Sequence, residues 1–476
     1  MSKLYVFAIG GTGSRVLRSL TMLAAAGVDI QANEIVPIII DPDESNADLT
    51  RTITLMNSYS SIRKGVDFSG DCGTTFFRTE ICQSVQNYSL HIKDTENKLF
   101  EEFIEYSSLS KENNAMMGML FSEKNLEANM KVGFKGNPNI GSVVLNQIES
   151  SPQFAEFANS FTQGDKIFII SSIFGGTGAS GFPLLLKTLR NPQATFQNHR
   201  IINNAQIGAI TILPYFKLQP SDDSEIDSST FISKARSALA YYEKNVVGNK
   251  SINALYYLAD DGNNIYANNE GGEQQQNPAH LIELLAATAA IHFMNTDYDG
   301  KYMNLEFGIK DINDNDAVTF GTFYSETEEM LMKPMTQFAL MANSLEEGSE
   351  QLNFITSDRL AANEKICAKE NVFKTSYFKE LMGFLKKYKE WLQELSDNKR
   401  SLDLFNLKCG DKPFELVTDR KPQQGGFLCF GKKNYEAFYE ALNKASQEIR
   451  GDKASSLFIE TFSRATKKLT EDKLKM

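Results

Sequence analysis

Short, continuously apolar runs alternate with stretches of helical spacing over residues 1 to about 295. Residues 3–9 (KLYVFAI) and 35–40 (IVPIII) are apolar nearly throughout, and residues 14–26 between them carry apolar side chains three and four positions apart. The same order returns at 166–174, which a helical pattern follows. Strands that are apolar on both faces and are joined by helices are typical of a parallel sheet covered on both sides. The pattern predicts an α/β domain with a doubly wound, parallel sheet over this half of the chain.

Other segments of this half fit the same scheme. Residues 277–294 are apolar on all sides and predict a buried helix, with Asn277 as its cap and Pro278 at its first position. Residues 51–130 are mostly polar, and only a helix near 96–106 is expected there. The remaining expected elements are a helix at 181–190, strands at 205–216 and 254–259, and an amphipathic helix at 230–245.

The pattern changes after about residue 300. Ser325 and Glu328 have the spacing of a capping box and predict a helix that reaches about residue 345. Apolar residues recur at helical spacing over 370–396 and indicate a helix packed against the core. The other expected elements are strands at 317–324, 414–417 and 426–430, and helices at 434–450 and 454–469.

Composition narrows the class of protein. Lys and Arg number 49 against 60 Asp and Glu, a net charge of −11, which argues against nucleic acid as a direct partner. No run of about 18 apolar residues is present, so no membrane span is expected, and the N-terminus lacks the pattern of a signal peptide. The five cysteines are scattered without a CxxC pair, which predicts neither a zinc site nor disulfides and fits the cytoplasm. They are Cys72, Cys82, Cys367, Cys409 and Cys429.

Two glycine-rich turns join an expected strand to an expected helix. In the first, Gly10, Gly11 and Gly13 are interleaved with Thr12 and Ser14. Glycine lets a backbone approach a phosphate, and a helix N-terminus offers unpaired N–H groups. Neither the Walker signature nor a complete GxGxxG is present. Taken alone, this turn would equally suit a dinucleotide site or a plain structural turn.

The second turn lies about 165 residues further along. It contains Gly175, Gly176, Thr177, Gly178 and Gly181. Two helix N-termini aimed at one phosphate chain would offset much of its charge without a P-loop lysine. The alternative is a pair of tight strand-to-helix turns, which would not require the interleaved Thr and Ser.

A third glycine-containing loop lies between the other two, at residues 133–147. Gly136, Asn137 and Gly141 there combine backbone and amide donors that suit a terminal phosphate. A plain loop would have the same composition.

These motifs together resemble the tubulin/FtsZ superfamily. The run FGGTGASG at 174–181 is similar to the family's signature, although Phe174 stands where a small residue is usual and Ser180 where the last glycine is expected. The resemblance covers about residues 3–300 and is nearest to divergent bacterial tubulin-like proteins. It implies an α/β fold in which a Rossmann-like, parallel-sheet GTPase domain at 1–276 binds the nucleotide. A central helix with a catalytic loop at 277–300 would join it to a C-terminal α+β domain with a helical extension at 301–476.

The resemblance also assigns roles to residues. It implies GTP or GDP as ligand together with Mg²⁺, and head-to-tail assembly of the chain with itself. Asn277 or Glu283 would meet the guanine, although a helix cap and a buried, paired glutamate are equal alternatives. The phosphate positions implied are Gly11 to Ser14, Asp41 (which would also face the metal), Gly136, Asn137, Gly141 and Gly175 to Gly178, with the ribose near Asp222, Asp223 and Glu225.

The segment MNTDYDGKY at 294–302 resembles the family's catalytic loop, whose acids enter the neighbouring subunit's nucleotide pocket. Asp297 matches the first acid and Asp299 would serve as the second. A polar surface turn is the competing interpretation, because Asn, Asp and Gly are turn formers.

Three functions remain open from the sequence. The first is a filament-forming GTPase. The second is a nucleotide-gated switch in a bacterial defence system, in which assembly signals to an adaptor or effector protein. The third is a dinucleotide-binding oxidoreductase, which the second glycine turn disfavours.

Overall fold

The structure is a computed structural model of the 476-residue chain. It describes residues 2–43, 45–69, 73–93, 95, 98–130, 134, 136–220, 228–260, 265–266, 272–313, 316–422 and 434–476.

A parallel sheet of seven strands forms the centre of the molecule, in the order β3-β2-β1-β4-β5-β7-β9. Four of its five inner strands are buried apart from their first residues, because both faces are covered, and this explains their largely apolar sequences. The predicted α/β fold with a parallel sheet is confirmed. The strands are β1 (Lys3–Ile9), β2 (Glu34–Ile40), β3 (Glu80–Ile81), β4 (Lys166–Ser172), β5 (Gln206–Ile212), β7 (Ala254–Leu258) and β9 (Met303–Glu306).

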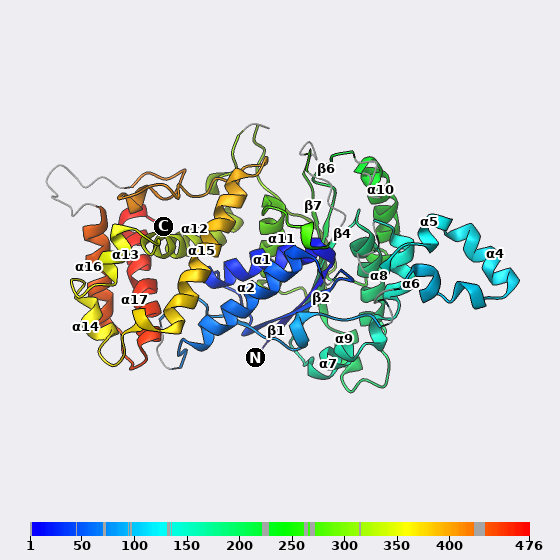
Figure 1. The fold of residues 1–476 in the computed structure, drawn as a ribbon, viewed down its shortest axis with the longest axis horizontal. Helices are drawn as coiled ribbons and strands as arrows, with labels where there is room; N and C mark the ends of the chain where they lie inside the picture. The colour runs from blue at the N-terminus through cyan, green and yellow to red at the C-terminus, as the bar shows by residue number, and fades with distance from the viewer. Residues whose placement is uncertain are drawn as a thin grey trace.

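Helices cover both faces of this sheet (Figure 1). On one side lie α1 (Gly10–Ala26), α2 (Ala47–Lys64) and α11 (Leu281–Asn295), and on the other α6 (Pro138–Leu145), α8 (Gly176–Arg190) and α10 (Phe231–Tyr242). The chain moves outward from β1 to β2 in one direction and from β4 to β5 in the other. The sheet therefore changes direction between β1 and β4, the place where doubly wound folds bind ligands.

The C-terminal part lies beyond α1 and α2 as a separate layer of helices (Figure 1). In this layer α12 packs against α1, and α15 packs against α2 through the predicted apolar stripe. Its helices are α12 (Ser325–Ser344), α13 (Glu350–Ile355), α14 (Ala362–Ile366), α15 (Ser376–Asp397), α16 (Asn434–Glu448) and α17 (Ala454–Leu469).

The strands predicted for this layer are not formed in the part of it that the structure describes. The segment 317–324 contains a 3-10 helix at Phe320–Thr322 with isolated bridges on either side, because the Thr322 hydroxyl donates to the Thr319 carbonyl and closes a turn. A 3-10 helix at Pro413–Glu415 replaces the first half of the strand expected at 414–417, and Val417 forms only an isolated bridge with Phe405. The strand expected at 426–430 lies outside the described residues.

The capping box expected for α12 is also absent. The helix begins at Ser325, and Tyr324 precedes it without a side-chain cap. Glu328 instead accepts a hydrogen bond from Arg420 at 2.7 Å, so its carboxylate is engaged elsewhere.

The polar region before α6 forms an arm at residues 98–130 that projects from the body (Figure 1). The helix expected near 96–106 is reduced to one turn, α3 (Phe100–Phe103), and the arm continues through α4 (Lys111–Leu120) and α5 (Glu123–Leu126). The shorter remaining elements are α7 (Pro152–Ser160), α9 (His199–Asn203), the paired strands β6 (Lys217–Leu218) and β8 (Ile265–Tyr266), and a π-helical turn at Glu243–Val247 that extends α10.

Two predictions from composition can be compared with the described residues. No described helix is both long and apolar enough to cross a membrane. Cys82, Cys367 and Cys409 are free thiols, while Cys72 and Cys429 lie outside the described residues.

Candidate functional site

The two glycine turns meet at one edge of the sheet. Helix α1 begins at Gly10 directly after β1, and α8 begins at Gly176 directly after β4, which is the parallel neighbour of β1. Both helix N-termini therefore lie at the carboxyl edge of the sheet. A Cβ atom built on Gly10 would lie 3.4 Å from the Cβ of Thr177, so the turns nearly touch. Gly10 also has a φ of 69°, a conformation that favours glycine.

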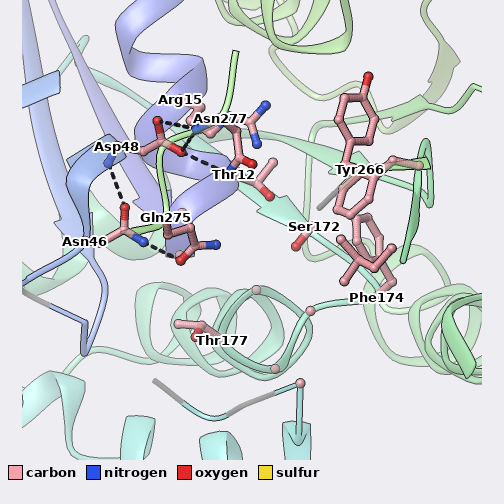
Figure 2. A pocket seen from close by; sticks show the side chains of 18 of the residues that line it. Thr12, Arg15, Asn46, Asp48, Ser172, Phe174, Thr177, Tyr266, Gln275 and Asn277 are labelled. Carbon is pink, nitrogen blue, oxygen red and sulfur yellow. Dashed lines mark hydrogen bonds between the residues drawn. The ribbon is translucent and has the colours of Figure 1, made fainter. Parts of the chain in front are cut away.

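A cavity opens between these helix starts. Its volume is about 210 Å³, which is below the roughly 300–1,000 Å³ of most small-molecule pockets. Figure 2 shows polar side chains on one side of the cavity and aromatic rings on the other, with Thr12 and Ser172 between them. Of the residues predicted for the phosphates, those that line it are Gly10, Gly11, Thr12, Asp41, Gly136, Gly175, Gly176, Thr177 and Gly178.

Some predicted glycines serve packing. A Cβ on Gly13 would lie 2.6 Å from the carbonyl carbon of Ala8, so this glycine lets α1 start close against β1. A Cβ on Gly141 would collide with the hydroxyl of Ser180, which joins α6 to α8. Neither glycine lines the cavity. Gly11 differs, because a Cβ there would have its nearest neighbour at 3.8 Å.

Ser14 and Asn137 also lie outside the cavity lining. Ser14 is fully buried, and its backbone carbonyl accepts a hydrogen bond from Thr52 at 3.0 Å. The Asn137 side chain caps α6, accepting from the N–H groups of Asn139 and Ile140. Both residues hold the helices that form the cavity.

The polar wall is a hydrogen-bonded group from two distant segments. Asn46 caps α2 through its side-chain oxygen and donates to Gln275 at 2.7 Å. Asp48 accepts from both the backbone and the side chain of Asn277, at 3.1–3.3 Å. Figure 2 shows these bonds as dashed lines. The segment before α11 is thereby tied to the start of α2.

Two expectations for α11 are corrected by these contacts. Asn277 does not cap the helix, because Asp48 engages its side chain and α11 begins four residues later at Leu281. The cap is His280, whose Nδ1 accepts from the N–H of Ile282 at 3.1 Å. Asn277 does line the cavity, and its contact with a base stays a prediction.

Glu283 is the buried, paired glutamate that the sequence left as an alternative. Its side chain is fully buried, forms an ion pair with Arg15 and lies 3.9 Å from Arg18. Burial raises the pKa of Glu283, and the two arginines oppose this shift. Glu283 is not among the residues that line the cavity.

Arg15 is a cavity residue that the sequence reasoning missed. Burial alone would lower its pKa, but the charge of Glu283 raises it above the ordinary value. A sequence signal was present: Arg15 stands in the second turn of a helix, near the positive end of its dipole, where a cation needs an anionic partner.

The aromatic wall was also missed. Phe174 and Phe216 have ring centroids 5.6 Å apart, and Phe216 lies 5.9 Å from Tyr266. The Tyr266 hydroxyl donates to Asn398, which follows α15, so the helical layer contributes directly to the cavity rim. Phe174, where the resembled family has a small residue, thus forms part of this wall.

Two buried polar atoms lie at the inner end of this wall. The His280 ring lies 4.8 Å from that of Tyr215, and each residue is 1% exposed. Neither His280 Nε2 nor the Tyr215 hydroxyl has a hydrogen-bond partner among the described residues. Burial lowers the pKa of His280 to about 3, so its ring is neutral. Because Nδ1 accepts a hydrogen bond, the proton is on Nε2, which is a donor. Unpaired buried donors of this kind indicate a missing partner such as water or a ligand.

Asp41 follows β2 at the same edge and lines the cavity. Burial raises its pKa to about 7, against a smaller opposing effect of the hydrogen bond from the Asp43 backbone. Asp43 lines the cavity beside Asp41. The described residues include no group of three or more metal-ligating side chains, so the protein alone would not supply a complete metal site there. One or two carboxylates completed by phosphate oxygens is the arrangement that Mg²⁺ prefers. The pair therefore fits a magnesium ion that arrives with a nucleotide.

Asp297 and Asp299 lie at the opposite edge of the sheet. Asp297 is exposed and accepts hydrogen bonds at 3.0 Å from Gln206, the first residue of β5, and from the N–H of Asp299. These bonds, the one from Asp299 first, lower the pKa of Asp297. A seven-residue strand such as β4 is roughly 20 Å long, so neither acid reaches the cavity of its own chain.

The predicted ribose residues Asp222, Asp223 and Glu225 lie outside the described residues.

Comparison with known proteins gives weak similarities. No family model and no curated protein matches the chain. Among solved structures, it is similar to CetZ2 from Haloferax volcanii in a GTPγS-bound protofilament, at 13% identity and a TM-score of 0.28, covering 54% of this chain and 49% of that one. It is also similar to GDP-bound CetZ1 from the same organism (14% identity, TM-score 0.28, 54% and 51% covered) and to an empty FtsZ dimer from M. jannaschii (15%, 0.25, 54% and 45%). The chain thus spans about half the length of these structures, and its function must be argued from its own site.

Proposed function

We propose that the cavity binds GTP, with the triphosphate between the N-termini of α1 and α8. The observation that carries the proposal is the meeting of Gly10 and Thr177 at the start of these helices. Each helix N-terminus acts as roughly half a positive charge with unpaired N–H groups, so two of them stabilise a phosphate chain. Gly11 leaves room for phosphate oxygens, and Thr12 lies beside it at the cavity.

The nucleobase lies against the aromatic wall in this proposal. Phe216 and Tyr266 offer rings for stacking, and the fixed Nε2–H donor of His280 suits an acceptor such as the O6 or N7 atom of guanine. The ligand would supply the partner that His280 and Tyr215 lack among the described residues. Guanine rather than adenine is the base that the family resemblance implies.

Mg²⁺ would be held by Asp41, with Asp43 beside it and phosphate oxygens completing the site. The metal would neutralise part of the phosphate charge. It would also favour the ionised form of Asp41, whose pKa burial raises to about 7.

The proposal extends to head-to-tail assembly. The cavity and Asp297 lie at opposite edges of one sheet, so stacking two chains along the strand direction would bring Asp297 of one copy to the nucleotide of the next. There Asp297, and Asp299 beside it, would orient the attacking water. Residues 1–276 would then be the nucleotide-binding domain, 277–300 the central helix with the catalytic loop, and 301–476 the C-terminal domain. The strand β9 of this last segment pairs with β7 in the central sheet.

The test uses purified full-length protein. Its co-purified nucleotide is identified by chromatography, and the affinities for GTP, ATP and NAD are measured by calorimetry with Mg²⁺. Electron microscopy with and without GTP then detects filaments. Preferential GTP binding supports the cavity assignment, and GTP-dependent filaments support assembly. Tight NAD binding, or no binding of any nucleotide, contradicts the proposal.

A further inference from the structure

The arm at residues 98–130 carries an uncovered apolar surface. On α4 three large side chains are strongly exposed: Met116 at 51%, Met119 at 82% and Leu120 at 59%. Their spacing of three and four positions places them on one face of the helix. No residue of α4 is buried, and Figure 1 shows the helix at the far end of the arm, away from the body. This is the spacing with which helices anchor in grooves of partner proteins.

A groove of matching character lies between α8 and α10. Its volume is about 880 Å³, and its apolar lining includes Pro183, Leu184 and Tyr241, the last 50% exposed. Tyr242 also lines it, and its buried hydroxyl has no hydrogen-bond partner among the described residues. The groove is large enough for several methionine or leucine side chains.

The charges of the arm and the groove are opposite. The arm contains six glutamates and three lysines, a net charge of −3. The described residues that line the groove include Lys187, Arg190 and Lys234 and no acidic side chain. Charge complementarity of this kind steers association and fixes which surfaces meet.

We infer that the exposed face of α4 docks in the α8–α10 groove of a second copy of this chain. The methionines suit such a groove, because their unbranched, flexible side chains fill irregular apolar space. One chain carries both the arm and the groove, so two copies can exchange arms reciprocally, as in an isologous dimer. This contact differs from the head-to-tail contact and needs no nucleotide.

The groove also shares a wall with the candidate nucleotide cavity. Phe174 and Gly175 line both. Docking of the arm therefore occurs against the same turn that begins α8.

The experiment is sedimentation velocity of the full chain without nucleotide and with EDTA, over a range of concentrations. We expect dimers in the wild type at low salt, a shift to monomer at high salt, and monomer at all concentrations for Met119→Lys, whose charge repels the basic groove. Tyr241→Ala tests the groove side and is expected to weaken the dimer at least tenfold. Circular dichroism checks that each variant is folded.

The matched control is Met303→Lys, which places the same charge at an exposed methionine (44%) on β9, outside the arm and the groove. It should dimerise like the wild type. A wild type that stays monomeric at all concentrations overturns the inference, and this includes the case in which the arm folds onto its own groove. A dimer that Met119→Lys leaves unchanged also overturns it.

Discussion

A Cβ atom built on Gly10 would lie 3.4 Å from the Cβ of Thr177, although the two residues lie far apart in the sequence. Their proximity follows from the pairing of β1 with β4, which places the starts of α1 and α8 side by side. The order of the strands in the sheet therefore produces the cavity between these two helix starts. What the cavity can bind depends on the polar side chains around it that have no partner within the protein.

Gly11→Val should abolish tight nucleotide binding without unfolding the protein. A Cβ at Gly11 has its nearest neighbour, Asn46 Nδ2, at 3.8 Å, so the valine side chain would occupy the proposed phosphate space without a backbone collision. We expect the GTP affinity to fall by at least about 100-fold, each tenfold step being about 1.4 kcal/mol. Calorimetry measures the affinity, and thermal unfolding measures the fold.

The matched variant is Gly13→Ala in the same turn. Its Cβ would lie 2.6 Å from the carbonyl carbon of Ala8, so the helix must shift, and a stability loss of about 1–3 kcal/mol is expected. If Gly11→Val and Gly13→Ala lost GTP affinity to the same extent and were equally stable, the assignment of Gly11 to the ligand and Gly13 to packing would be contradicted.

Arg15→Met should destabilise the protein strongly, because it leaves Glu283 buried without its nearest cation. Removing one partner of a buried pair costs about 3–5 kcal/mol. The double variant Arg15→Met with Glu283→Gln removes both charges, keeps a side-chain acceptor for the backbone N–H of His280, and should recover much of the loss. Urea unfolding of the two variants and the wild type measures this difference, and a double variant no more stable than Arg15→Met would contradict the pairing.

The elements that the sequence predicted well are those with local signals. The strands β1, β2, β4, β5 and β7 are short, largely apolar runs, which are typical of strands that are buried on both faces. The meeting of the two glycine turns was also predictable, since helices that follow neighbouring parallel strands start at the same edge.

The details of α11 depended on distant residues. The sequence offered Asn277 as a cap, but Asp48 from α2 engages the Asn277 amide, and the helix starts later with His280 as its cap. The aromatic wall likewise draws rings from three separate segments, and its contact with Asn398 comes from the C-terminal layer. No local pattern reports which of several polar side chains a distant partner will engage.

Asp41 should make the stability of the ligand-free protein depend on pH. Its pKa in the folded state is raised from 3.8 to about 7 by burial, so folding favours the protonated form. The corresponding stabilisation is fully present below about pH 4 and is lost as the pH rises through about 7. The melting temperature of Asp41→Asn relative to wild type should therefore rise between pH 5 and pH 8.

The control for this measurement is Asp297→Asn. The pKa of exposed Asp297 is lowered below 3.8, so its contribution is constant above about pH 5. The difference in melting temperature between this variant and the wild type should not change between pH 5 and pH 8. A pH-independent difference for Asp41→Asn would show that Asp41 titrates normally. Adding Mg²⁺ and GTP should reduce the effect at Asp41, because a bound cation favours its ionised form.

Asp297→Ala should leave GTP binding unchanged and slow GTP hydrolysis. The residue lies at the far edge of the sheet, roughly 20 Å from the cavity of its own chain. A carboxylate that orients or deprotonates water contributes about 10²–10⁴-fold to the rate, and a loss of this size is expected in a phosphate-release assay. Asp299→Ala tests the second acid in the same way. Unchanged turnover in both variants would remove the catalytic role proposed for this loop.

Mixing two inactive variants should restore hydrolysis if the acid acts on the neighbouring copy. Gly11→Val lacks the nucleotide but keeps Asp297, whereas Asp297→Ala binds the nucleotide but lacks the acid. In a head-to-tail mixture, the nucleotide bound by an Asp297→Ala chain can meet Asp297 of a neighbouring Gly11→Val chain. That contact between subunits contains both the nucleotide and the acid. The turnover per Asp297→Ala chain should therefore rise as Gly11→Val is added. The double variant Gly11→Val/Asp297→Ala is the matched additive and should restore nothing, because it brings no acid. If both additives leave turnover at the level of Asp297→Ala alone while filaments still form, the acid does not act across the contact between subunits.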